Sequence, residues 1–244
     1  MVQPISISVQ GVQKNFGPVE ALKKINLEFV EGKMHGVIGP EGAGKTTLMR
    51  IILGLLKPVH GKVEFKKGGK IVEYEEVRPH LAYMPSSQSL YADLSIDEHL
   101  SFFKELYGID NEDFEKRREN LLHITRLKKF VDRPAGKLSG GMYKKLGLMC
   151  ALLRKPHAML LDEPTNGVDP ISRREFWELL YGLLDQKILI LVTTAYMDEA
   201  ERCSQVHLME DGKLITSGSP IELLDAHGVK TFDELFLKHN GGVR

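Results

Sequence analysis

The feature that most constrains this chain is a glycine-rich segment between a short apolar run and a stretch with helical spacing. The apolar run extends from Met34 to Ile38, and the helical stretch extends from Thr46 to Leu55. The residues that match the pattern G-x-x-x-x-G-K-[ST] are Gly39, Pro40, Glu41, Gly42, Ala43, Gly44, Lys45 and Thr46. A strand, a glycine turn and a helix in this order direct backbone N–H groups and a helix N-terminus at one point, which predicts a phosphate-binding loop.

Three side chains at the end of this segment have expected roles. Lys45 is expected to reach the β- and γ-phosphates, Thr46 to ligate Mg²⁺ and Thr47 to hold the α-phosphate. A glycine-rich turn can match the pattern by accident. Here the strand before it and the helix after it are the context that the pattern requires, so the sequence predicts binding of ATP with Mg²⁺.

Two carboxylates follow another apolar run, Met159 to Leu161, and are followed by Pro164. A parallel sheet places ligands beyond the carboxyl ends of its strands, so Asp162 is a candidate ligand of Mg²⁺. Glu163 is then placed to orient or deprotonate the water that attacks the γ-phosphate. Alone, such a strand end is usually only solvated. Together with the glycine segment, it predicts a nucleotide hydrolase.

Short apolar runs predict two kinds of strand. Apolar and polar residues alternate in Ile5–Val9 and Ile25–Val30, which is typical of half-buried strands in an antiparallel layer. Short, largely apolar runs, typical of a parallel core, are Ala158–Leu161, Ile188–Val192 and Val206–Met209. The sequence therefore predicts a β-rich start and a later parallel sheet.

Helical spacing dominates the middle of the chain. The helices expected there are Ser95–Tyr107, Glu112–Thr125 and Gly140–Leu153. A further amphipathic helix, Ser172–Leu184, lies between two of the apolar runs. We infer a helical subdomain inserted into an α/β core.

Composition and charge exclude several function classes. Lys plus Arg and Asp plus Glu are both 33, so no global field favours a nucleic-acid partner. The only cysteines, Cys150 and Cys203, are too few for a disulfide framework, which fits a reducing cytoplasmic setting. Apolar runs such as Ile188–Val192 are far shorter than the roughly 18 residues of a membrane span, and the N-terminus does not read as a secretory signal. Any membrane part would come from a partner.

A third motif, Leu138-Ser139-Gly140-Gly141-Met142, opens the helix that is expected to end at Leu153. Alone it would be an ordinary serine cap with a flexible entrance. With the glycine segment and the paired carboxylates in the same order and rough spacing, the chain resembles ATP-binding-cassette (ABC) domains over nearly all of its 244 residues. The resemblance implies a P-loop NTPase (RecA-like) α/β core with an antiparallel β subdomain and an inserted helical subdomain.

The resemblance also implies one nucleotide-binding domain over residues 1–244. Its β-rich and RecA-like core would comprise residues 1–86 and 156–220, and its helical signature subdomain residues 87–155. Residues 221–244 would form C-terminal helices and a tail. Phe232–His239 is expected to be helical and to lead to a Gly-Gly-Val-Arg end, which could be a linker if the chain is one half of a longer polypeptide.

Further site residues and partners are implied by the resemblance. Ser139, Gly140 and Gly141 would cap ATP held by a second ABC ATPase subunit or domain, in a homodimer or a heterodimer. Phe16 would stack on adenine, unless it is a buried strand aromatic, and Asp169 would lie in the loop that couples the two sites. An integral membrane transporter subunit would be the other partner, with this chain peripheral on the cytoplasmic face.

Two positions depart from the family pattern. After the expected strand Leu81–Met84, Ser86 stands where the family has Gln, unless a different loop path brings Gln88 there or a water bridges from Ser86. Ala195 stands where a His normally contacts the γ-phosphate. Losing one such contact commonly costs on the order of 10²-fold in rate, so slow hydrolysis is expected. The nine histidines form no evident cluster in the sequence, and a lone one such as His35 or His157 is expected to be packed or at the surface.

The sequence leaves two functions open. Leu90–Ser95 and Tyr196–Arg202 resemble multidrug and antibiotic exporter ATPases, and Met142 in place of the commoner Gln also appears in such members. A cassette of similar appearance could instead be a soluble ATP switch on a ribosome or an assembly complex. The transported substance cannot be inferred, because selectivity would lie in membrane segments of a partner.

Overall fold

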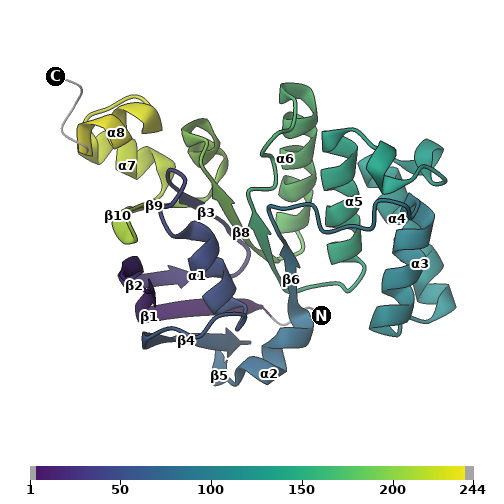
Figure 1. The fold of residues 1–244 in the computed structure, drawn as a ribbon, viewed down its shortest axis with the longest axis horizontal. Helices are drawn as coiled ribbons and strands as arrows, with labels where there is room; N and C mark the ends of the chain where they lie inside the picture. Colours follow the sequence, from purple (N-terminus) through teal and green to yellow (C-terminus); the bar gives the residue numbers. More distant parts are fainter. Residues whose placement is uncertain (1–3, 240–244) are drawn as a thin grey trace.

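An antiparallel sheet begins the chain in the computed structural model, which describes residues 4–239 (Figure 1). Its strands lie in the order β2-β1-β4-β5. Their bounds are Ile5–Phe16 (β1), Val19–Phe29 (β2), His60–Lys67 (β4) and Lys70–Val72 (β5). Ile5, Ile7 and Val9 are buried and the serines between them are less so, as period-2 alternation requires. The predicted antiparallel layer is confirmed.

A second sheet has the strand order β10-β9-β3-β8-β7-β6. All of its neighbouring strands are parallel except β10, which pairs antiparallel with β9 at the edge. The bounds are Met34–Ile38 (β3), Leu81–Met84 (β6), Ala158–Asp162 (β7), Leu189–Thr194 (β8), Gln205–Glu210 (β9) and Lys213–Gly218 (β10). The inner strands β3, β7 and β8 are mostly apolar, because both faces of this sheet are covered.

Alternate side chains of the parallel strands enter two separate cores. Leu160 and Leu191 pack with the antiparallel sheet and α1 (Lys45–Ile52), which lies between the two sheets (Figure 1). Leu161 and Val192 pack on the other face, with Trp177 of α6 (Pro170–Leu184). The glycine loop before α1 therefore lies at the junction of both sheets.

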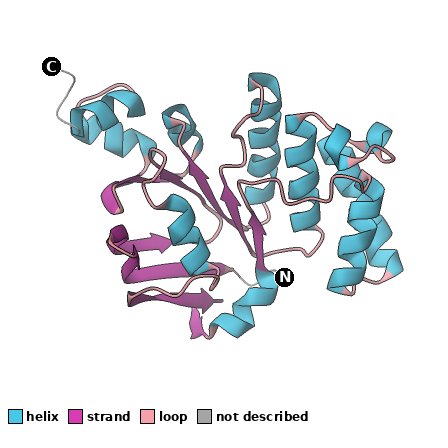
Figure 2. Cartoon of the chain, viewed as in Figure 1, coloured by secondary structure: helices cyan, strands magenta, loops and turns pink. Residues whose placement is uncertain are grey.

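The inserted helices form a subdomain with a core of its own, on the far side of α6 from the antiparallel sheet (Figure 2). Its longer helices are α3 (Ile96–Tyr107), α4 (Asn111–Thr125) and α5 (Gly140–Leu152). Each begins at a side chain that accepts a backbone hydrogen bond: Ser95, Asp110 and Ser139. The predicted helices are confirmed to within a residue or so at each end.

The remaining elements are short. They are α2 (Tyr74–Val77), α7 (Pro220–His227), α8 (Phe232–His239) and the 3₁₀ turns η1 (Arg78–His80), η2 (Lys128–Phe130), η3 (Ala135–Lys137) and η4 (Met197–Arg202). The expected helix α8 is confirmed, and α7 lies where C-terminal helices were expected, whereas β4, β5, β10 and α2 were not expected. The Gly-Gly-Val-Arg end lies outside the described residues. Within residues 4–239, no helix is both long and apolar enough to cross a bilayer.

Candidate nucleotide site

The glycine loop leaves β3 at Gly39 and enters α1 at Lys45. A Cβ on Gly39 would lie 2.0 Å from the Met209 carbonyl oxygen. Gly44 has a φ of +97°, and a Cβ there would lie 2.5 Å from the Ala21 carbonyl oxygen. Neither position accepts a side chain, so the first and last glycines of the pattern are required by the close approach of β9 and β2 as well as by the turn.

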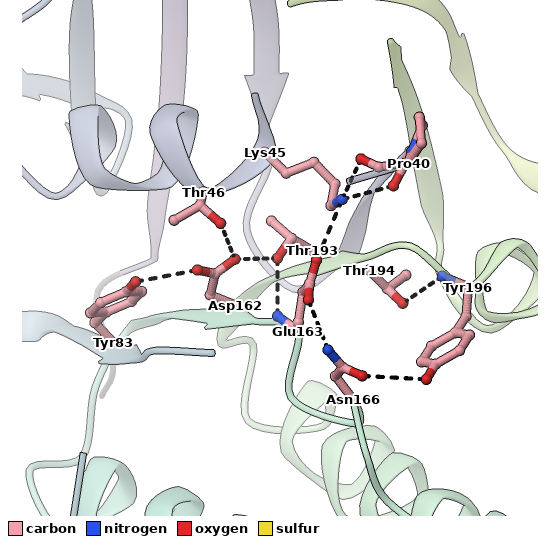
Figure 3. Close-up of polar contacts among 11 residues, drawn as sticks. Pro40, Lys45, Thr46, Tyr83, Asp162, Glu163, Asn166, Thr193, Thr194 and Tyr196 are labelled. Atoms are coloured by element: carbon pink, nitrogen blue, oxygen red, sulfur yellow. Dashed lines mark hydrogen bonds and ion pairs between the residues drawn. The ribbon is translucent and has the colours of Figure 1, made fainter. Parts of the chain in front are cut away.

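Lys45 points back into the loop that precedes it (Figure 3). Its side chain is 4% exposed, and its Nζ donates hydrogen bonds to the carbonyl oxygens of Gly39 (2.7 Å) and Pro40 (2.9 Å). The same Nζ lies 3.4 Å from Glu163 Oε1. A largely buried ammonium group at the centre of a turn attracts anions strongly, so Lys45 can exchange these contacts for phosphate oxygens.

Asp162 ends β7 with a fully buried carboxylate. Its Oδ1 accepts hydrogen bonds from Thr193 Oγ1 at 2.6 Å and from Thr46 Oγ1 at 3.0 Å. Its Oδ2 lies 3.5 Å from the Tyr83 hydroxyl. Carboxylate and hydroxyl oxygens are the ligands that Mg²⁺ prefers, so the Thr46–Asp162 pair fits that ion.

Glu163 has an unusual backbone, with a φ of +47°. Its N–H donates to the carbonyl oxygen of Thr193 at 3.1 Å and lies 3.0 Å from the Thr193 hydroxyl. These contacts hold a conformation that costs on the order of 1–3 kcal/mol in a residue other than glycine. The result turns the carboxylate toward Lys45 and the loop instead of along the strand.

A pocket of about 490 Å³ adjoins the loop and is large enough for a nucleotide. Its lining includes residues of the glycine loop, Thr46, Thr47 and Glu163. Phe16, at the end of β1, also lines it and is 49% exposed. The alternative that Phe16 is a buried strand aromatic is therefore wrong, since its ring is available at the pocket's edge.

The Ser139 segment and Asp169 lie elsewhere and do not line this pocket. Ser139 and Gly140 are exposed at the start of α5, where Ser139 Oγ accepts a hydrogen bond from the Met142 N–H. Gly141 is buried, and a Cβ there would lie 2.4 Å from Ser172 Cβ. The exposed part of the segment is therefore free to meet another molecule, whereas Gly141 is required by the packing of α5 on α6.

Asp169 is exposed and caps α6. Its Oδ1 accepts hydrogen bonds from the N–H groups of Ser172 at 3.0 Å and Ile171 at 3.2 Å. The hydrogen bonds from Ser172, with a smaller effect from Ile171, hold the pKa of the Asp169 carboxyl below its usual value. Asp169 thus has a structural task in the loop before α6, beside any contact with a partner.

Residues 22–166 match the sequence profile described as ABC transporter. This chain belongs to the ABC transporter family. It is 41% identical over 228 residues to a protein of Escherichia coli K12 named "Probable multidrug ABC transporter ATP-binding protein YbhF". The match covers 93% of this chain and 39% of that protein. It is 34% identical over 224 residues to the Nod factor export ATP-binding protein I of Bradyrhizobium diazoefficiens, covering 91% of this chain and 73% of that protein.

Solved ABC structures share the whole fold. An ATP-binding subunit of an ABC transporter matches with a TM-score of 0.82 and 27% identity. The match covers 96% of this chain and 99% of that subunit. The protein cbiO1 of Clostridium perfringens, described as part of the transporter complex cbiONQ, matches with a TM-score of 0.80 and 27% identity, over 91% of each chain. The predicted P-loop NTPase fold class is confirmed.

One of the two departures from the ABC pattern, Ser86, is exposed in the loop after β6. Its carbonyl oxygen accepts a hydrogen bond from Lys144 Nζ at 3.3 Å, and the same ammonium lies 3.4 Å from the carbonyl oxygen of Glu163. Burial lowers the pKa of Lys144 from its usual value. Sequence reasoning missed Lys144, and its position on the helix that Ser139 opens was the available signal.

The other departure, Ala195, follows β8 and faces Glu163. It lines a cavity of about 120 Å³ with Glu41, Glu163, Asn166, Thr194 and Tyr196. The Tyr196 hydroxyl lies 3.4 Å from Asn166 Oδ1, and Asn166 Nδ2 lies 3.2 Å from Glu163 Oε2. Sequence reasoning missed Asn166 and Tyr196 as neighbours of Glu163, because the chain segments that carry them are about thirty residues apart.

Histidines pair in the structure although they are dispersed in the sequence. His35 and His207 stack with their ring centroids 5.3 Å apart, and His80 and His157 stack at 4.3 Å. Neither pair is evident from the sequence alone. His35 is packed, as expected, with 1% of its surface exposed.

Proposed function

We propose that this chain is the ATP-binding, energy-coupling subunit or domain of an ABC exporter. The observation that carries this proposal is the convergence of four side chains beside one pocket. Lys45 and Thr46 come from the start of α1, and Asp162 and Glu163 from the end of β7.

Each of these residues has one task. Thr46 and Asp162 hold Mg²⁺, and Lys45 together with the loop N–H groups binds the β- and γ-phosphates. When bound, Mg²⁺ neutralises the charge of the triphosphate. Glu163 orients the attacking water and accepts its proton, while Phe16 stacks on the base at the edge of the pocket. Thr47 binds the α-phosphate.

Hydrolysis at this chain's own site is slow. Ala195 offers no polar group to the γ-phosphate, and the short Ser86 side chain cannot reach as far as a glutamine. Each missing contact would otherwise stabilise the transition state and not only the bound nucleotide. The site therefore still binds ATP, whereas the rate of ATP hydrolysis is reduced.

The exposed start of α5, at Ser139 and Gly140, indicates which partner the site requires. Ser139 and Gly140 present a serine hydroxyl and a helix N-terminus to solvent, away from the chain's own pocket. They close over ATP held by a second cassette, which in turn closes over ATP held here, in a homodimer or a heterodimer. Asp169, at the start of α6, lies in the loop that links the two sites.

A membrane partner provides the transport path. The relatives named as multidrug and Nod factor exporters support export, with this chain bound to an integral membrane subunit on the cytoplasmic face. The chain spans about 39% of the first of these relatives, so a second cassette in the same polypeptide is one way to supply the partner. The transporter names do not favour a ribosome-bound or scaffold-bound switch, and the balanced charge of the chain gives a nucleic acid no electrostatic advantage as partner.

Calorimetry with MgATP tests the binding step. The purified chain is expected to bind ATP only in the presence of Mg²⁺, and Lys45→Ala is expected to abolish the signal. Lys129→Ala, which removes an exposed lysine in η2, is the matched control and is expected to bind normally. The absence of magnesium-dependent binding in the folded parent would refute the proposal.

Cell fractionation tests the setting, and reconstitution tests the asymmetry. Cosedimentation with membranes is expected, whereas cosedimentation with ribosomes would favour the switch. ATPase activity is expected to rise when the chain is mixed with a cassette that supplies an intact second site. Fast hydrolysis by the isolated chain would contradict the slow site.

A further inference from the structure

A hydrogen-bonded relay extends from Glu163 to a tyrosine on another loop (Figure 3). Tyr196 Oη donates to Asn166 Oδ1 at 3.4 Å, and Asn166 Nδ2 donates to Glu163 Oε2 at 3.2 Å. The tyrosine hydroxyl meets the amide oxygen, and this leaves the amide N–H₂ facing the carboxylate. Tyr196 thus selects the orientation in which Asn166 can donate to Glu163.

Buried contacts hold both loops that carry the relay. The guanidinium of Arg173 lies 4.1 Å from the centroid of the Tyr196 ring. Next to Asn166, Thr165 Oγ1 donates to Glu199 at 2.7 Å, and Trp177 Nε1 donates to the same carboxylate oxygen at 3.1 Å. The loop after β7 and the loop after β8 are therefore tied together by residues that do not line the nucleotide pocket. A relay with such support is preorganised.

The relay acts on the oxygen of Glu163 that Lys45 does not contact. Lys45 lies 3.4 Å from Oε1, whereas Asn166 lies on the Oε2 side. Phosphate oxygens compete for the Lys45 ammonium, so nucleotide binding weakens the first contact and leaves the second. In the cavity beside Ala195, the polar groups that remain next to Glu163 come from Glu41, Asn166, Thr194 and Tyr196. Among these, only Asn166 donates a hydrogen bond to Glu163 in the described residues.

We propose that Asn166 and Tyr196 are positioning residues for Glu163, which hold its carboxylate toward the attacking water at a site that lacks an imidazole at position 195. This inference rests on the proposed function, because it assigns a task only if Glu163 serves hydrolysis. Asn166 acts directly on the carboxylate. Tyr196 acts through Asn166.

The first test is a double-mutant cycle on the steady-state ATPase rate of the full chain. Tyr196→Phe keeps the ring over Arg173 and removes only the hydroxyl, so kcat is expected to fall about 2- to 10-fold while KM for MgATP stays unchanged. Asn166→Ala is expected to lower kcat at least as much. Because Tyr196 acts through Asn166, adding Tyr196→Phe to Asn166→Ala is expected to cost nothing further. Tyr181→Phe, which removes a hydroxyl that lies 3.3 Å from the Arg202 carbonyl oxygen, is the control and is expected to retain the parent rate.

The second test separates kcat from KM at the residue that contacts Glu163 directly. Asn166→Asp places a carboxylate where the amide donates, so the hydrogen bond to Glu163 Oε2 is lost. The kcat is therefore expected to fall while KM for MgATP stays unchanged, whereas Tyr181→Phe leaves both in place. This test does not depend on the folding of the tyrosine variant.

The outcomes separate this inference from the proposed function. Glu163→Gln is expected to abolish hydrolysis and retain MgATP binding, and an active variant would refute the proposed function itself. With Glu163→Gln inactive, an unchanged kcat in Tyr196→Phe or in Asn166→Asp would overturn the relay alone. Full additivity of Tyr196→Phe and Asn166→Ala would also overturn it.

Discussion

His35 Nδ1 lies 3.0 Å from His207 Nε2, with both rings buried on the adjacent parallel strands β3 and β9. Phe29 meets both rings edge-on, and Ser217 on β10 lies 2.6 Å from the second nitrogen of His207. Burial lowers the pKa of His35 to about 4 and that of His207 to about 3. The pair is thus neutral in the folded protein under conditions in which the unfolded chain binds protons.

Stability is therefore expected to fall as the pH decreases. Both pKa values are lower in the folded state than the unfolded value of about 6.5. The contribution of the two neutral histidines to the free energy of unfolding is therefore fully present above pH 6.5 and is lost as the pH falls. Between pH 6.5 and 4, each histidine is expected to remove up to about 1.4 kcal/mol per pH unit. Urea unfolding at pH 7.5, 6 and 5 measures the slope. His207→Gln is expected to flatten it, His123→Gln at an exposed site of α4 is not, and an equal slope in both variants would contradict the assignment.

The fully buried Glu199 carboxylate is expected to contribute strongly to stability. Glu199→Ala leaves Thr165 Oγ1 and Trp177 Nε1 without their acceptor and leaves Arg173 without a carboxylate at 3.7 Å. The free energy of unfolding is expected to fall by about 3 kcal/mol, since unpaired buried donors cost more than a surface contact. Chemical denaturation of Glu199→Ala and of Glu201→Ala, at an exposed neighbouring position, makes the comparison. Equal stabilities would show that the buried network contributes little.

Two helical glycines are expected to respond to alanine in opposite directions. Gly141→Ala places a Cβ 2.4 Å from Ser172 Cβ, which forces α5 away from α6 and is expected to cost about 1–3 kcal/mol. Gly182, within α6, has no atom within 4 Å of an added Cβ, so Gly182→Ala is expected to stabilise by about 0.5–1 kcal/mol. Thermal unfolding of both variants decides the signs. A neutral Gly141→Ala would mean that this glycine is kept for contact with a partner and not for packing.

Phe16 is expected to affect nucleotide affinity without affecting stability. Its ring is about half exposed, so Phe16→Ala removes little buried area. Loss of stacking is expected to weaken MgATP binding about 5- to 10-fold, while Phe16→Trp retains it. Calorimetry provides the affinities, and Val59→Ala, at an exposed position outside the pocket, serves as the control. Undiminished binding by Phe16→Ala would exclude stacking.

Local signals account for what the sequence predicted. The glycine loop, the strand before it and the helix after it depend on neighbouring residues, and so do the caps at Ser95 and Ser139. The strands that were missed have weaker patterns: β4 reads His-Gly-Lys-Val-Glu-Phe-Lys-Lys and is mostly polar. It becomes a strand because β1 pairs with it, from Ile5 opposite Lys67 to Gln13 opposite His60. Tertiary pairing here overrides local preference.

Contacts across long sequence separations account for what could not be predicted. Lys45 and Glu163 meet over more than a hundred residues, yet the family pattern made their proximity an expectation. No comparable pattern connected His35 with His207, or Asn166 with Tyr196. In each case, neighbouring parallel strands bring the two segments together, and the strand order decides which residues become partners.

Replacing Ala195 is expected to change the rate of hydrolysis more than it changes binding. The cavity of about 120 Å³ between Ala195 and Glu163 can receive a larger side chain, and an imidazole there would add a polar group beside the γ-phosphate. Ala195→His is therefore expected to raise kcat by up to about 10²-fold, with KM for MgATP nearly unchanged. Ala195→Leu fills the same space without a polar group and is expected to give no acceleration. If both variants are as slow as the parent, Ser86 limits the rate, and Ser86→Gln in the Ala195→His background is then expected to restore it. If neither Ala195→His nor its combination with Ser86→Gln accelerates turnover, the slow step lies outside the γ-phosphate contacts.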